Sequence, residues 1–580
     1  MKELISESDI QSITKLNNKR FKIVNKALMQ LTGINKLNDL YKRIAKSSNT
    51  DFIDAFFDEL NLNIEFDENE LRHIPKSGKF ITVSNHPFGA IDGLVLLKIL
   101  KDKRPDFKIM ANFLLQNIPE LSEKFIAVNP FENLKTKSNI NGVKSAYKHL
   151  EEGNALGVFP AGEVSSYQTN SRKVTDNQWK NGSIRIIQRS EAPVIPIFFS
   201  GGNSLFFHLI GLINPTLRTA QLPKEMLRKK DATLKIRIGS PIKPDTIKAF
   251  DQVEVLSRYL RSRTYSLSSG LEIKNFFFNK KKKKVYALDV IPPVEGNSIE
   301  AELLALPDNQ KIISQGEFDV YLAFSNESPN ALRELGRLRE ETFRAVGEGT
   351  NLSIDVDEYD LYYHHLILWD REAKKIAGAY RIGKGNDILT KFGVRGFYIN
   401  SLFTIKKQML PILNQSLELG RSFVRDEYQM KRLPLFLLWK GLMNFILSNP
   451  EYRYIIGPVS ISNSYSRISK KVIVNVIKKY YFDNEKAQWV KPKHKFRADI
   501  KNQDVSEILN YVDSDLKNID RLISDIEPLH FTLPVLLKKY INQNAKIICF
   551  NRDPNFNNAL DGLMILDLKE LSAESIKSYS

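Results

Sequence analysis

The strongest constraint on the fold is the regular alternation of short apolar runs with helical stretches in the first half of the chain. The strand-like run at 79–85 is followed by a helical stretch at about 92–100, and this change of period recurs downstream. Strands that alternate with helices predict an α/β domain with a largely parallel sheet. The other strand-like runs are 107–112, 124–130, 155–162, 192–200 and 234–242, with helical stretches at 141–153 and 181–191 among them.

The second half of the chain predicts another α/β unit, which does not repeat the first. The segment 410–424 predicts a strand or loop that leads into a helix. Two neighbouring runs, 362–370 and 375–384, predict paired strands around a turn. The remaining elements are strands at 318–324 and 452–462 and helices at 330–347 and 435–449.

The length and a change of composition predict two domains. A chain of 580 residues is too long for one ordinary core, and a lysine-rich stretch with a Pro-Pro pair separates the two patterns. The predicted fold class is α/β with two sheet domains. The predicted division is a helical N-terminal segment at 1–60, a first α/β domain at 61–275, a basic linker at 276–310 and a second α/β domain at 311–572.

Charge and cysteine content limit the partners and the compartment. Lysine and arginine exceed aspartate and glutamate by 18, which predicts an anionic partner such as a phospholipid surface, a nucleic acid or an acidic protein. Because no recognised nucleic-acid-reading motif is present, we expect no nucleic acid partner. The single cysteine, Cys549, excludes an intramolecular disulfide and fits a reducing compartment.

Several stretches bear on membrane contact. We find no secretory signal and no uncharged apolar run of the ~18 residues that a spanning helix needs. The apolar segment 204–217 contains His208 and Pro215 and predicts either a buried core segment or an interfacial contact. The run Lys280–Lys284 is either a solvated face or an attachment to anionic lipid worth about 1 kcal/mol per residue. The aromatic Phe276–Phe278 beside it favours attachment.

A histidine and an aspartate flank a turn after the first strand. Asn85 and His86 end the run, Gly89 lies in the turn, and Asp92 begins the next helix. A neutral imidazole can take a proton from a hydroxyl, and a carboxylate on its other nitrogen fixes the tautomer. The residues alone leave two interpretations open: a base with its orienting partner, or a loop histidine beside a helix-capping aspartate.

Further motifs follow in order, with VFPAGEVSS at 158–166 and APVIPI at 192–197. Together with Asn-His and the later Asp, they resemble the lysophospholipid acyltransferase superfamily, of the glycerol-phosphate acyltransferase type, over about 75–245. The resemblance implies acyl transfer from a thioester to a hydroxyl, with His86 as the base and Asp92 as its orienting partner. It implies a substrate site formed by Asn85, Gly89, Pro160, Gly162 and Glu163.

The chain departs from that family at its charged positions. The His-x5-Asp spacing is one residue longer, Ala161 stands where the family has Glu, and Val164 stands where it has Arg. A carboxylate is found instead at Glu163, and the family's arginine motif between the blocks is absent. Because arginines bind an acceptor phosphate, their loss predicts a hydroxyl-bearing lipid acceptor without glycerol phosphate.

The second half carries charged residues at short spacings. Arg339 and Phe343 share one face of a predicted helix, and Glu418 and Arg421, three residues apart, are predicted to share a face as well. Singly, such residues are typical of surface ion pairs. Together they predict a charged site beside an apolar sheet, with Asp355, Asp357, Asp360 and Arg381.

These spacings resemble the acyl-homoserine lactone synthases and the related hemolysin-type N-acyltransferases, relatives of the GNAT fold, over about 318–570. The resemblance implies attack of an amine on an acyl thioester. An amine must lose a proton before it attacks, and we expect Glu418 to be the base, directly or through water. Arg339 and Arg421 organise the acidic cluster or bind a substrate carboxylate. The implied substrate-binding residues are Arg339, Phe343, Asp357, Asp360, Arg381 and Arg421.

We expect no tightly bound cofactor and no metal. The stretch RIGKG at 381–385 has the wrong spacing for the pyrophosphate loop of acetyl-CoA-dependent relatives. We therefore expect acyl carrier protein as the donor, with acyl-CoA as the alternative, since an acidic carrier suits this basic chain. His364 and His365 are adjacent on a strand and point to opposite faces, which disfavours metal binding.

The two halves together resemble the bifunctional bacterial ornithine-lipid synthases. That resemblance implies that the second domain acylates an amino acid, here ornithine, with a 3-hydroxyacyl chain. The first domain would then acylate the new hydroxyl. It also implies peripheral attachment to the cytoplasmic face of the bacterial inner membrane, with the amino acid and the lyso-lipid as substrates.

Three alternatives remain open. One is a lysophospholipid acyltransferase whose second domain is degenerate. Another is the same two-step chemistry on glycine, glutamine or a different amine. The last is a non-enzymatic, basic, membrane-binding protein of the hemolysin-like kind.

Overall fold

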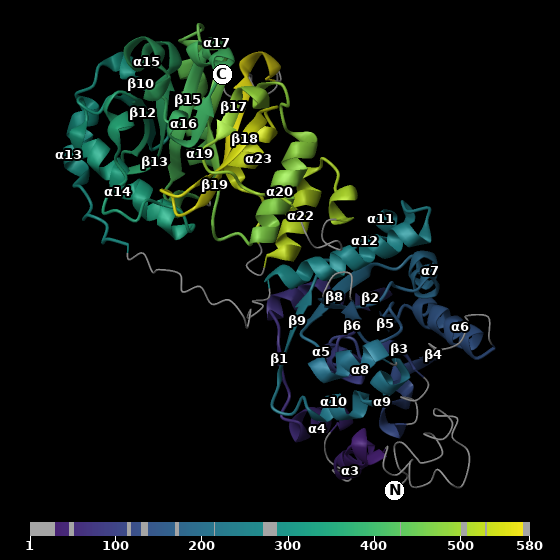
Figure 1. The fold of residues 1–580 in the computed structure, drawn as a ribbon. Helices are drawn as coiled ribbons and strands as arrows, with labels where there is room; N and C mark the ends of the chain where they lie inside the picture. The colour runs from purple at the N-terminus through teal and green to yellow at the C-terminus, as the bar shows by residue number, and fades with distance from the viewer. Residues whose placement is uncertain are drawn as a thin grey trace, which may run out of the picture. The chain divides into compact units, whose positions relative to one another are not determined.

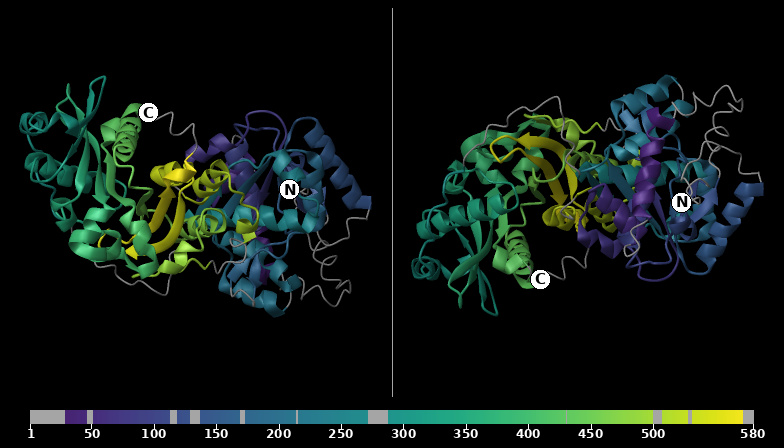
Figure 2. Two further views of the ribbon diagram at one scale, coloured as in Figure 1. Left: turned by 90° about the horizontal axis from the view of Figure 1, so that it is seen from above. Right: turned by 90° about the horizontal axis from the view of Figure 1, so that it is seen from below.

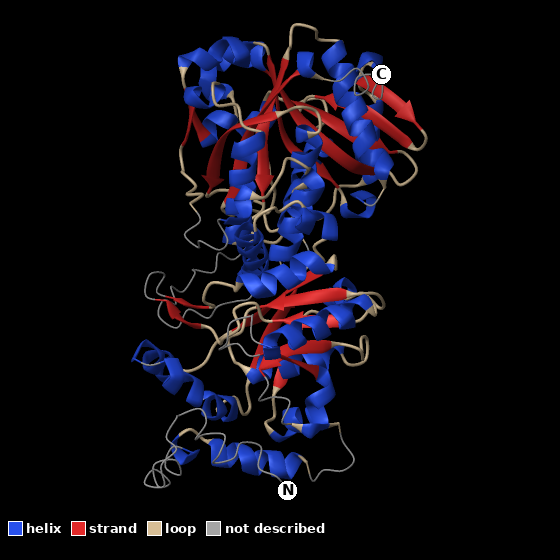
Figure 3. Ribbon diagram, turned by 90° about the vertical axis from the view of Figure 1, so that its right-hand side faces the viewer, coloured by secondary structure: helices blue, strands red, loops and turns tan. Residues whose placement is uncertain are grey.

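The computed structural model divides into two compact units (Figure 1). The first comprises 1–273, 501–511 and 524–530, and the second the remainder. Each has its own sheet packed with helices, drawn red and blue in Figure 3, so the predicted class of two α/β domains is confirmed. The structure describes residues 29–45, 51–112, 118–128, 137–168, 173–213, 215–270, 287–429, 431–499, 507–527 and 531–571. The lysine run and its aromatic neighbours lie outside these residues.

The first unit contains a seven-stranded sheet in the order β1-β9-β8-β2-β5-β3-β4. The five strands from β8 to β4 run parallel, and β9 pairs antiparallel with β8. Parallel neighbours need long crossovers, which explains why helices separate these strands in the sequence. The strands are β1 (Asn63–Glu65), β2 (Phe80–Ser84), β3 (Lys108–Asn112), β4 (Phe125–Val128), β5 (Ala155–Val158), β8 (Val194–Ser200) and β9 (Thr233–Ile238).

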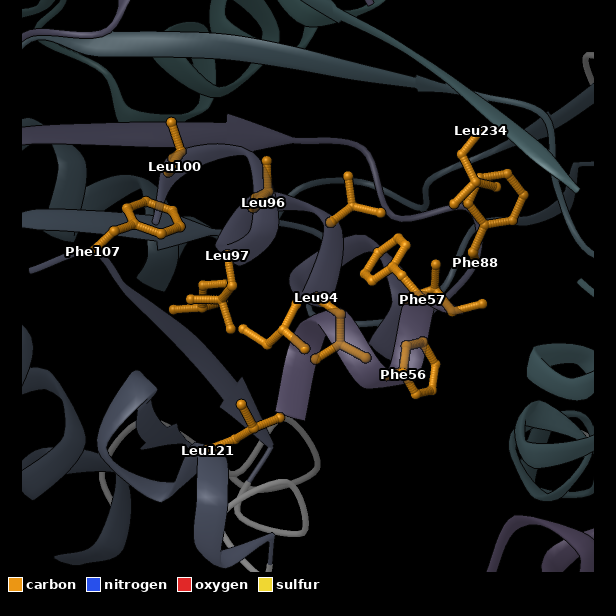
Figure 4. Close-up of a cluster of buried hydrophobic side chains, with 14 of the residues drawn as sticks. Phe56, Phe57, Phe88, Leu94, Leu96, Leu97, Leu100, Phe107, Leu121 and Leu234 are labelled. Atoms are coloured by element: carbon orange, nitrogen blue, oxygen red, sulfur yellow. The ribbon is translucent and has the colours of Figure 1, made fainter. Parts of the chain in front are cut away.

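Helices cover both faces of this sheet (Figure 2). All residues of β2 are buried: Phe80 packs toward one face, whereas Ile81 and Val83 pack toward the other. Figure 4 shows the first cluster, where phenylalanines of α4 meet leucines of α5. The helices of that face are α3 (Ile34–Ile44), α4 (Phe52–Glu59) and α5 (Ala90–Leu100), and those of the other are α6 (Lys137–Glu151), α7 (Asn181–Ser190) and α12 (Val253–Ser266).

Three short helices lie between β8 and β9: α8 (Leu205–Ile213), α9 (Pro215–Ala220) and α10 (Leu222–Leu227). The apolar segment 204–217 is partly buried and partly exposed. Phe207 and His208 are buried, while one face of α8 is open to solvent, with 50–72% exposure at Leu205, Phe206, Leu209 and Leu212. Within the described ranges, no helix is long and apolar enough to cross a membrane.

The second unit contains an eight-stranded sheet in the order β10-β11-β12-β13-β15-β16-β19-β18. Neighbours are antiparallel except β15 and β16, which are parallel. The strands are β10 (Lys311–Gln315), β11 (Phe318–Ala323), β12 (His364–Asp370), β13 (Lys375–Lys384), β15 (Ser416–Val424), β16 (Tyr454–Ile461), β18 (Lys546–Asp553) and β19 (Ala559–Asp567).

Helices again pack on the two faces of this sheet. Leu335 and Leu338 of α14 join the cluster on one face, and α19 packs on the other, where Gly441 lies against Val320 and Leu366. The helices of this unit are α13 (Gly296–Leu304), α14 (Pro329–Ala345), α15 (Gly385–Phe392), α16 (Ile399–Leu402), α17 (Leu410–Asn414), α18 (Asp426–Gln429), α19 (Arg432–Leu447), α20 (Arg467–Tyr480), α23 (Val535–Ile541) and the part of α22 (Leu516–Ile526) up to Ile523.

The prediction for 410–424 is wrong in its order of elements. A short helix, α17, comes first and the strand β15 follows it. Pro411 favours the first turn of a helix, where its missing amide hydrogen costs nothing. The following Ser-Leu-Glu-Leu alternates polar and apolar residues, a period typical of a strand.

A C-terminal segment belongs to the first unit although its sequence range falls within the predicted second domain. Asp525, at the end of α22, binds the buried Arg263 of α12 and accepts from Ser240 N at 3.0 Å. The ring of Tyr511 stacks edge-on against Phe250 and Tyr259. A buried ion pair and an aromatic cluster therefore hold this late segment in the first unit.

The Asp525–Arg263 pair gives a stability prediction. We expect Asp525→Ala to lower the free energy of unfolding of the first unit by about 3–5 kcal/mol, because it leaves Arg263 buried without its counter-charge. Denaturant unfolding of the full chain measures this. As the control, Glu65→Ala breaks the exposed pair with Lys235 and should cost less than about 1 kcal/mol. Equal effects of the two substitutions would contradict the prediction.

Candidate active sites

The first site lies at the carboxyl end of β2, where parallel α/β sheets bind their ligands. Asn85 connects this end to β8: its side-chain amide donates to Phe199 O at 2.9 Å, and its side-chain oxygen accepts from Phe199 N at 2.8 Å. The amide of Asn85 is thus engaged with backbone, and it positions the next residue, His86. Gly89 (φ 91°) caps α5 in a conformation that side chains disfavour.

His86 and Asp92 form a hydrogen-bonded pair across the turn. His86 Nδ1 lies 2.9 Å from Asp92 Oδ2, and that same oxygen accepts from Phe88 N at 3.0 Å and Gly89 N at 3.1 Å. Asp92 therefore caps α5 and orients the imidazole at once, so the two interpretations of the sequence are compatible. Burial raises the pKa of Asp92, against the hydrogen bond and charge of His86 and the two amides.

The pair leaves His86 Nε2 as the ring nitrogen for chemistry. The Asp92 carboxylate is fully buried, while the His86 side chain is 18% exposed. The Phe159 ring lies 4.3 Å from the imidazole, centroid to centroid, and shields one side of it. An imidazole held in one tautomer, with its second nitrogen reachable, is suited to take a proton from a hydroxyl.

The segment that follows β5 forms the other wall of the site. Ser165 N donates to His86 O at 2.8 Å, and Pro160 O accepts from Lys180 N at 2.9 Å. Gly162 has a φ of 68°, and a side chain there would come within 3.0 Å of Lys180 Nζ. Pro160 and Gly162 thus shape this loop next to His86.

Two residues that the sequence analysis missed complete the first site. Asp176 accepts from His86 N at 3.1 Å and from Ser165 Oγ at 2.6 Å, so it joins both walls. Arg218 of α9 is buried and donates to Glu163 at 2.9 Å, beside a hollow of about 200 Å³ that His208 also lines. Arg218 comes from a distant helix, and no local motif identifies it.

The second site is built on a buried network of charges. Arg339 of α14 donates to Asp360 at 2.8 Å, and Arg381 of β13 lies 3.2 Å from the same carboxylate and also binds Asp357. Burial alone would raise the pKa of Asp360, but the two guanidinium groups hold it well below its usual range. The structure therefore brings together the helix, loop and strand residues that the spacing predicted.

A β-bulge brings Glu418 and Arg421 to the same side of the sheet. Opposite β13, Ala379 faces Phe423 but Arg381 faces Gly420, so β15 carries one extra residue, and Arg421 has a φ of 48°. In a regular strand, residues three apart point to opposite faces. The shared helical face predicted for these two residues is wrong, because the bulge and not a helix places them together.

Glu418 and Arg421 both bind Tyr398. Glu418 accepts from Tyr398 N at 3.1 Å, from Ile399 N at 2.7 Å and from the Tyr363 hydroxyl. Burial raises the pKa of Glu418 to about 7, although the Tyr363 hydroxyl, the amides and Arg381 oppose the rise. Arg421 donates to Tyr398 Oη at 3.2 Å and pairs with Asp355 at 2.9 Å.

Phe343 reaches this network through a second aromatic ring. Its ring lies 5.2 Å from that of Phe556, and Phe556 lies 5.2 Å from the Arg421 guanidinium. His364 and His365 face opposite sides of β12: His365 contacts Arg339, and the His364 ring lies 4.1 Å from that of Phe324, centroid to centroid. Among the described residues, no group of three or more potential ligands could hold a metal ion.

The parallel strands β15 and β16 separate at the second site. Their pairing runs from Ser416/Tyr454 to Glu418/Ile456 and then stops. Glu348, which the sequence analysis missed, lies beyond this point and accepts from Ser460 Oγ of β16 at 2.9 Å. Burial raises the pKa of Glu348 to about 7 despite Ser460 and Arg421. The only local sequence signal for Glu348 is the pair of glycines on either side of it, Gly347 and Gly349.

Comparisons with known proteins find a match in each half of the chain. A family model described as "Acyltransferase" matches residues 23–274, and one described as "Acetyltransferase (GNAT) domain" matches 338–439. Together, the folds, the sites and these matches define a two-domain acyltransferase. This excludes the non-enzymatic alternative.

The relatives narrow the family. The glycine N(alpha)-acyltransferase of Bacteroides thetaiotaomicron is 31% identical over 46% of this chain and 82% of its own length. The lyso-glycine lipid O-acyltransferase of Phocaeicola vulgatus is 27% identical over 45% of this chain and 94% of its own. The L-ornithine N(alpha)-acyltransferase of Brucella abortus is 33% identical over 22% and 47%. The chain belongs to the acyltransferase family that includes the Bacteroides thetaiotaomicron protein.

The His86–Asp92 pair gives a prediction for acyl transfer by the first unit. Asp92→Asn keeps an oxygen for the helix-capping amides but presents the wrong partner to the imidazole. We expect the rate of O-acyl transfer to fall about 10²–10⁴-fold. Steady-state assays with a lyso-lipid acceptor measure this, with Glu191→Gln, in an exposed pair with Lys248, as the control. A rate within twofold of wild type would contradict a role for the pair.

Proposed function

We propose that this chain makes an amino-acid lipid in two acyl transfers. The second unit acylates the amine of an amino acid with a 3-hydroxyacyl chain, and the first unit acylates the hydroxyl of that chain. The observation that carries the proposal is that one polypeptide has both kinds of site and resembles both an N-acyltransferase and a lyso-lipid O-acyltransferase. The two relatives each cover less than half of the chain, which leaves room for both activities.

In the first site, His86 Nε2 takes the proton of the lipid hydroxyl as its oxygen attacks the thioester carbonyl. Asp92, bound to Nδ1, stabilises the imidazolium that forms. The imidazolium then returns its proton to the departing thiolate. This chemistry needs one group that accepts a proton and then returns it, and an imidazole can do both.

The residues around Glu163 favour an acceptor that carries a carboxylate. Arg218 presents a guanidinium at the hollow beside Glu163, and guanidinium groups bind carboxylates in a two-pronged geometry. Its present partner, Glu163, is 37% exposed and can yield to a substrate carboxylate. An N-acyl amino acid offers that group and has no phosphate, in line with the missing arginine at Val164.

The relatives bear on which amino acid supplies the amine. The relatives named for glycine are matched over 82% and 94% of their length, and the relative named for ornithine over 47%. We therefore propose glycine as the first candidate acceptor and keep ornithine as the second, because the ornithine relative has the higher identity over its shorter match.

The donor and the membrane surface follow from charge and exposure. We propose a 3-hydroxyacyl thioester of acyl carrier protein as the donor for the amine, since the net charge of +18 suits an acidic partner. We propose that the exposed apolar face of α8 enters a lipid surface. Three exposed basic residues in and just after α10 suit anionic headgroups: Lys224, Arg228 and Lys230.

Lipid analysis of a bacterial host without amino-acid lipids tests the two steps. Wild-type protein should yield a diacylated amino lipid whose headgroup identifies the amine. His86→Ala should accumulate the monoacyl form, because only the O-acyl step needs this imidazole. His494→Ala, at an exposed position, serves as the control. If no amino lipid forms and only phospholipid acylation changes, the chain is a lysophospholipid acyltransferase and the proposal fails.

The apolar face of α8 gives a membrane prediction. Replacing Leu209 and Leu212 by Glu removes two exposed leucines and adds charge, and should lower binding to vesicles with anionic lipid about tenfold or more. Leu304→Glu, at a 70% exposed leucine of the second unit, should leave vesicle binding unchanged. Sedimentation with vesicles measures both. Unchanged sedimentation of the double variant would rule out this surface.

A further inference from the structure

Glu418 is poorly placed to be the base for the amine, because its carboxylate already accepts hydrogen bonds from the protein. Both its oxygens accept hydrogen bonds, from the amides of Tyr398 and Ile399 and from the Tyr363 hydroxyl, and the residue is 1% exposed. Two of these three donors are backbone amides, so the carboxylate fixes the turn at Tyr398 and Ile399. An amine could reach it only by displacing part of that turn.

A second carboxylate, Glu348, is placed where the strands separate. Its loop has φ of 79° at Gly347 and 97° at Gly349, so side chains are disfavoured on both sides. Gly347 O accepts from Asn557 Nδ2 at 2.8 Å, and Glu348 N donates to Phe343 O at 2.8 Å. The backbone of Glu348 is therefore held firmly, while the carboxylate receives one neutral donor, Ser460 Oγ.

Asp561 of β19 lies opposite Ser460 in the strand register and faces the same group of charges. It is 4% exposed, and its Oδ2 has no hydrogen-bond partner. Burying an unpaired carboxylate oxygen is costly unless a donor arrives from outside the chain. An unpartnered oxygen in this position points to a ligand that brings its own hydrogen atoms.

The charged groups around Glu348 and Asp561 favour the binding of a cation. Asp553 of β18 adds a third carboxylate beside Asp561, and Arg421 of β15 is the cation that faces them. Arg421 already pairs with Asp355 and Asp357. Behind Gly349, Glu340 and Arg344 of α14 bind each other. Carboxyl groups therefore outnumber guanidinium groups here, and burial together with the neighbouring carboxylates Asp553 and Glu348 raises the pKa of Asp561, so that an arriving cation would stabilise its ionised form.

We infer that Glu348 and Asp561 bind the ammonium group of the acceptor amino acid and that Glu348 is the base that deprotonates it. The inference rests on the proposed N-acyl transfer and adds the substrate-binding group. An ammonium brings three donors, which match the oxygens left open on these two carboxylates.

The proton balance of the step is complete. Glu348 takes one proton from the ammonium, and the neutral nitrogen attacks the thioester carbonyl to form the C–N bond. When the C–S bond breaks, a second proton from the nitrogen goes to the departing sulfur, which leaves as a thiol. Glu348 then releases its proton to solvent. A carboxylate buried enough to have a pKa near 7 is matched to this task at neutral pH.

The test uses the full chain with a 3-hydroxyacyl thioester of acyl carrier protein, and glycine and ornithine as amines, between about pH 5.5 and 9. Wild-type kcat should fall as the pH drops through about 7, because protonated Glu348 cannot accept a proton. Glu348→Gln should lower kcat about 10²-fold or more and remove that step, and Glu348→Asp should restore part of the rate. Asp561→Asn should raise KM for the amine about tenfold with a smaller change in kcat.

Glu418→Gln is the matched control and should lower the melting temperature while keeping the pH profile. The inference is overturned if Glu348→Gln keeps the wild-type rate, or if only Glu418→Gln removes the pH step. O-acyl transfer by the same preparations reports folding. If the wild-type chain acylates no amine, the proposed function fails, and the inference fails with it; if it does and Glu348→Gln is unaffected, only the inference fails.

Discussion

Each of the two candidate sites contains buried carboxylates that are held by donors from the surrounding chain. Asp92 receives an imidazole and two amides, Asp360 receives two guanidinium groups, and Glu418 receives two amides and a phenol. Each set of donors comes from more than one element. Because an unpaired buried carboxylate is expensive, these contacts fix the relative positions of strand ends, turns and helix termini.

The parts of the structure that sequence predicts well are those with a local cause. β2, the turn at Gly89 and α5 follow from an apolar run, a glycine and a helix start, and with them comes the His86–Asp92 pair. The bulge at Arg421 has no such local cause. One extra residue in the pairing of β15 decides which face Arg421 occupies, and that depends on β13, forty residues earlier.

The site residues that the sequence analysis missed are also positioned by contacts between distant parts of the chain. Arg218 reaches Glu163 from a helix 55 residues away, and Asp561 comes opposite Ser460, the hydrogen-bond partner of Glu348, only through the pairing of β16 with β19. Neither has a motif around it. Glu348 could be predicted only in part. The two glycines beside it indicate an unusual backbone, whereas the position of its carboxylate depends on where β15 and β16 separate.

The bases proposed for the two sites fit the different protons that the two proposed reactions remove. A lipid hydroxyl is neutral, and its proton is best taken by a neutral imidazole, which becomes a cation beside Asp92 and stays compensated. An amino acid arrives with its amine as an ammonium, so the site must first attract a cation. Carboxylates do both, since they bind the ammonium and then accept its proton. A positively charged base such as an imidazolium would repel the acceptor after each turnover, whereas a protonated Glu348 is neutral and leaves Asp561 free to hold the next one. Under the proposed function, the excess of acidic residues where β15 and β16 separate serves amine acylation, in the same way that the His86–Asp92 pair serves hydroxyl acylation.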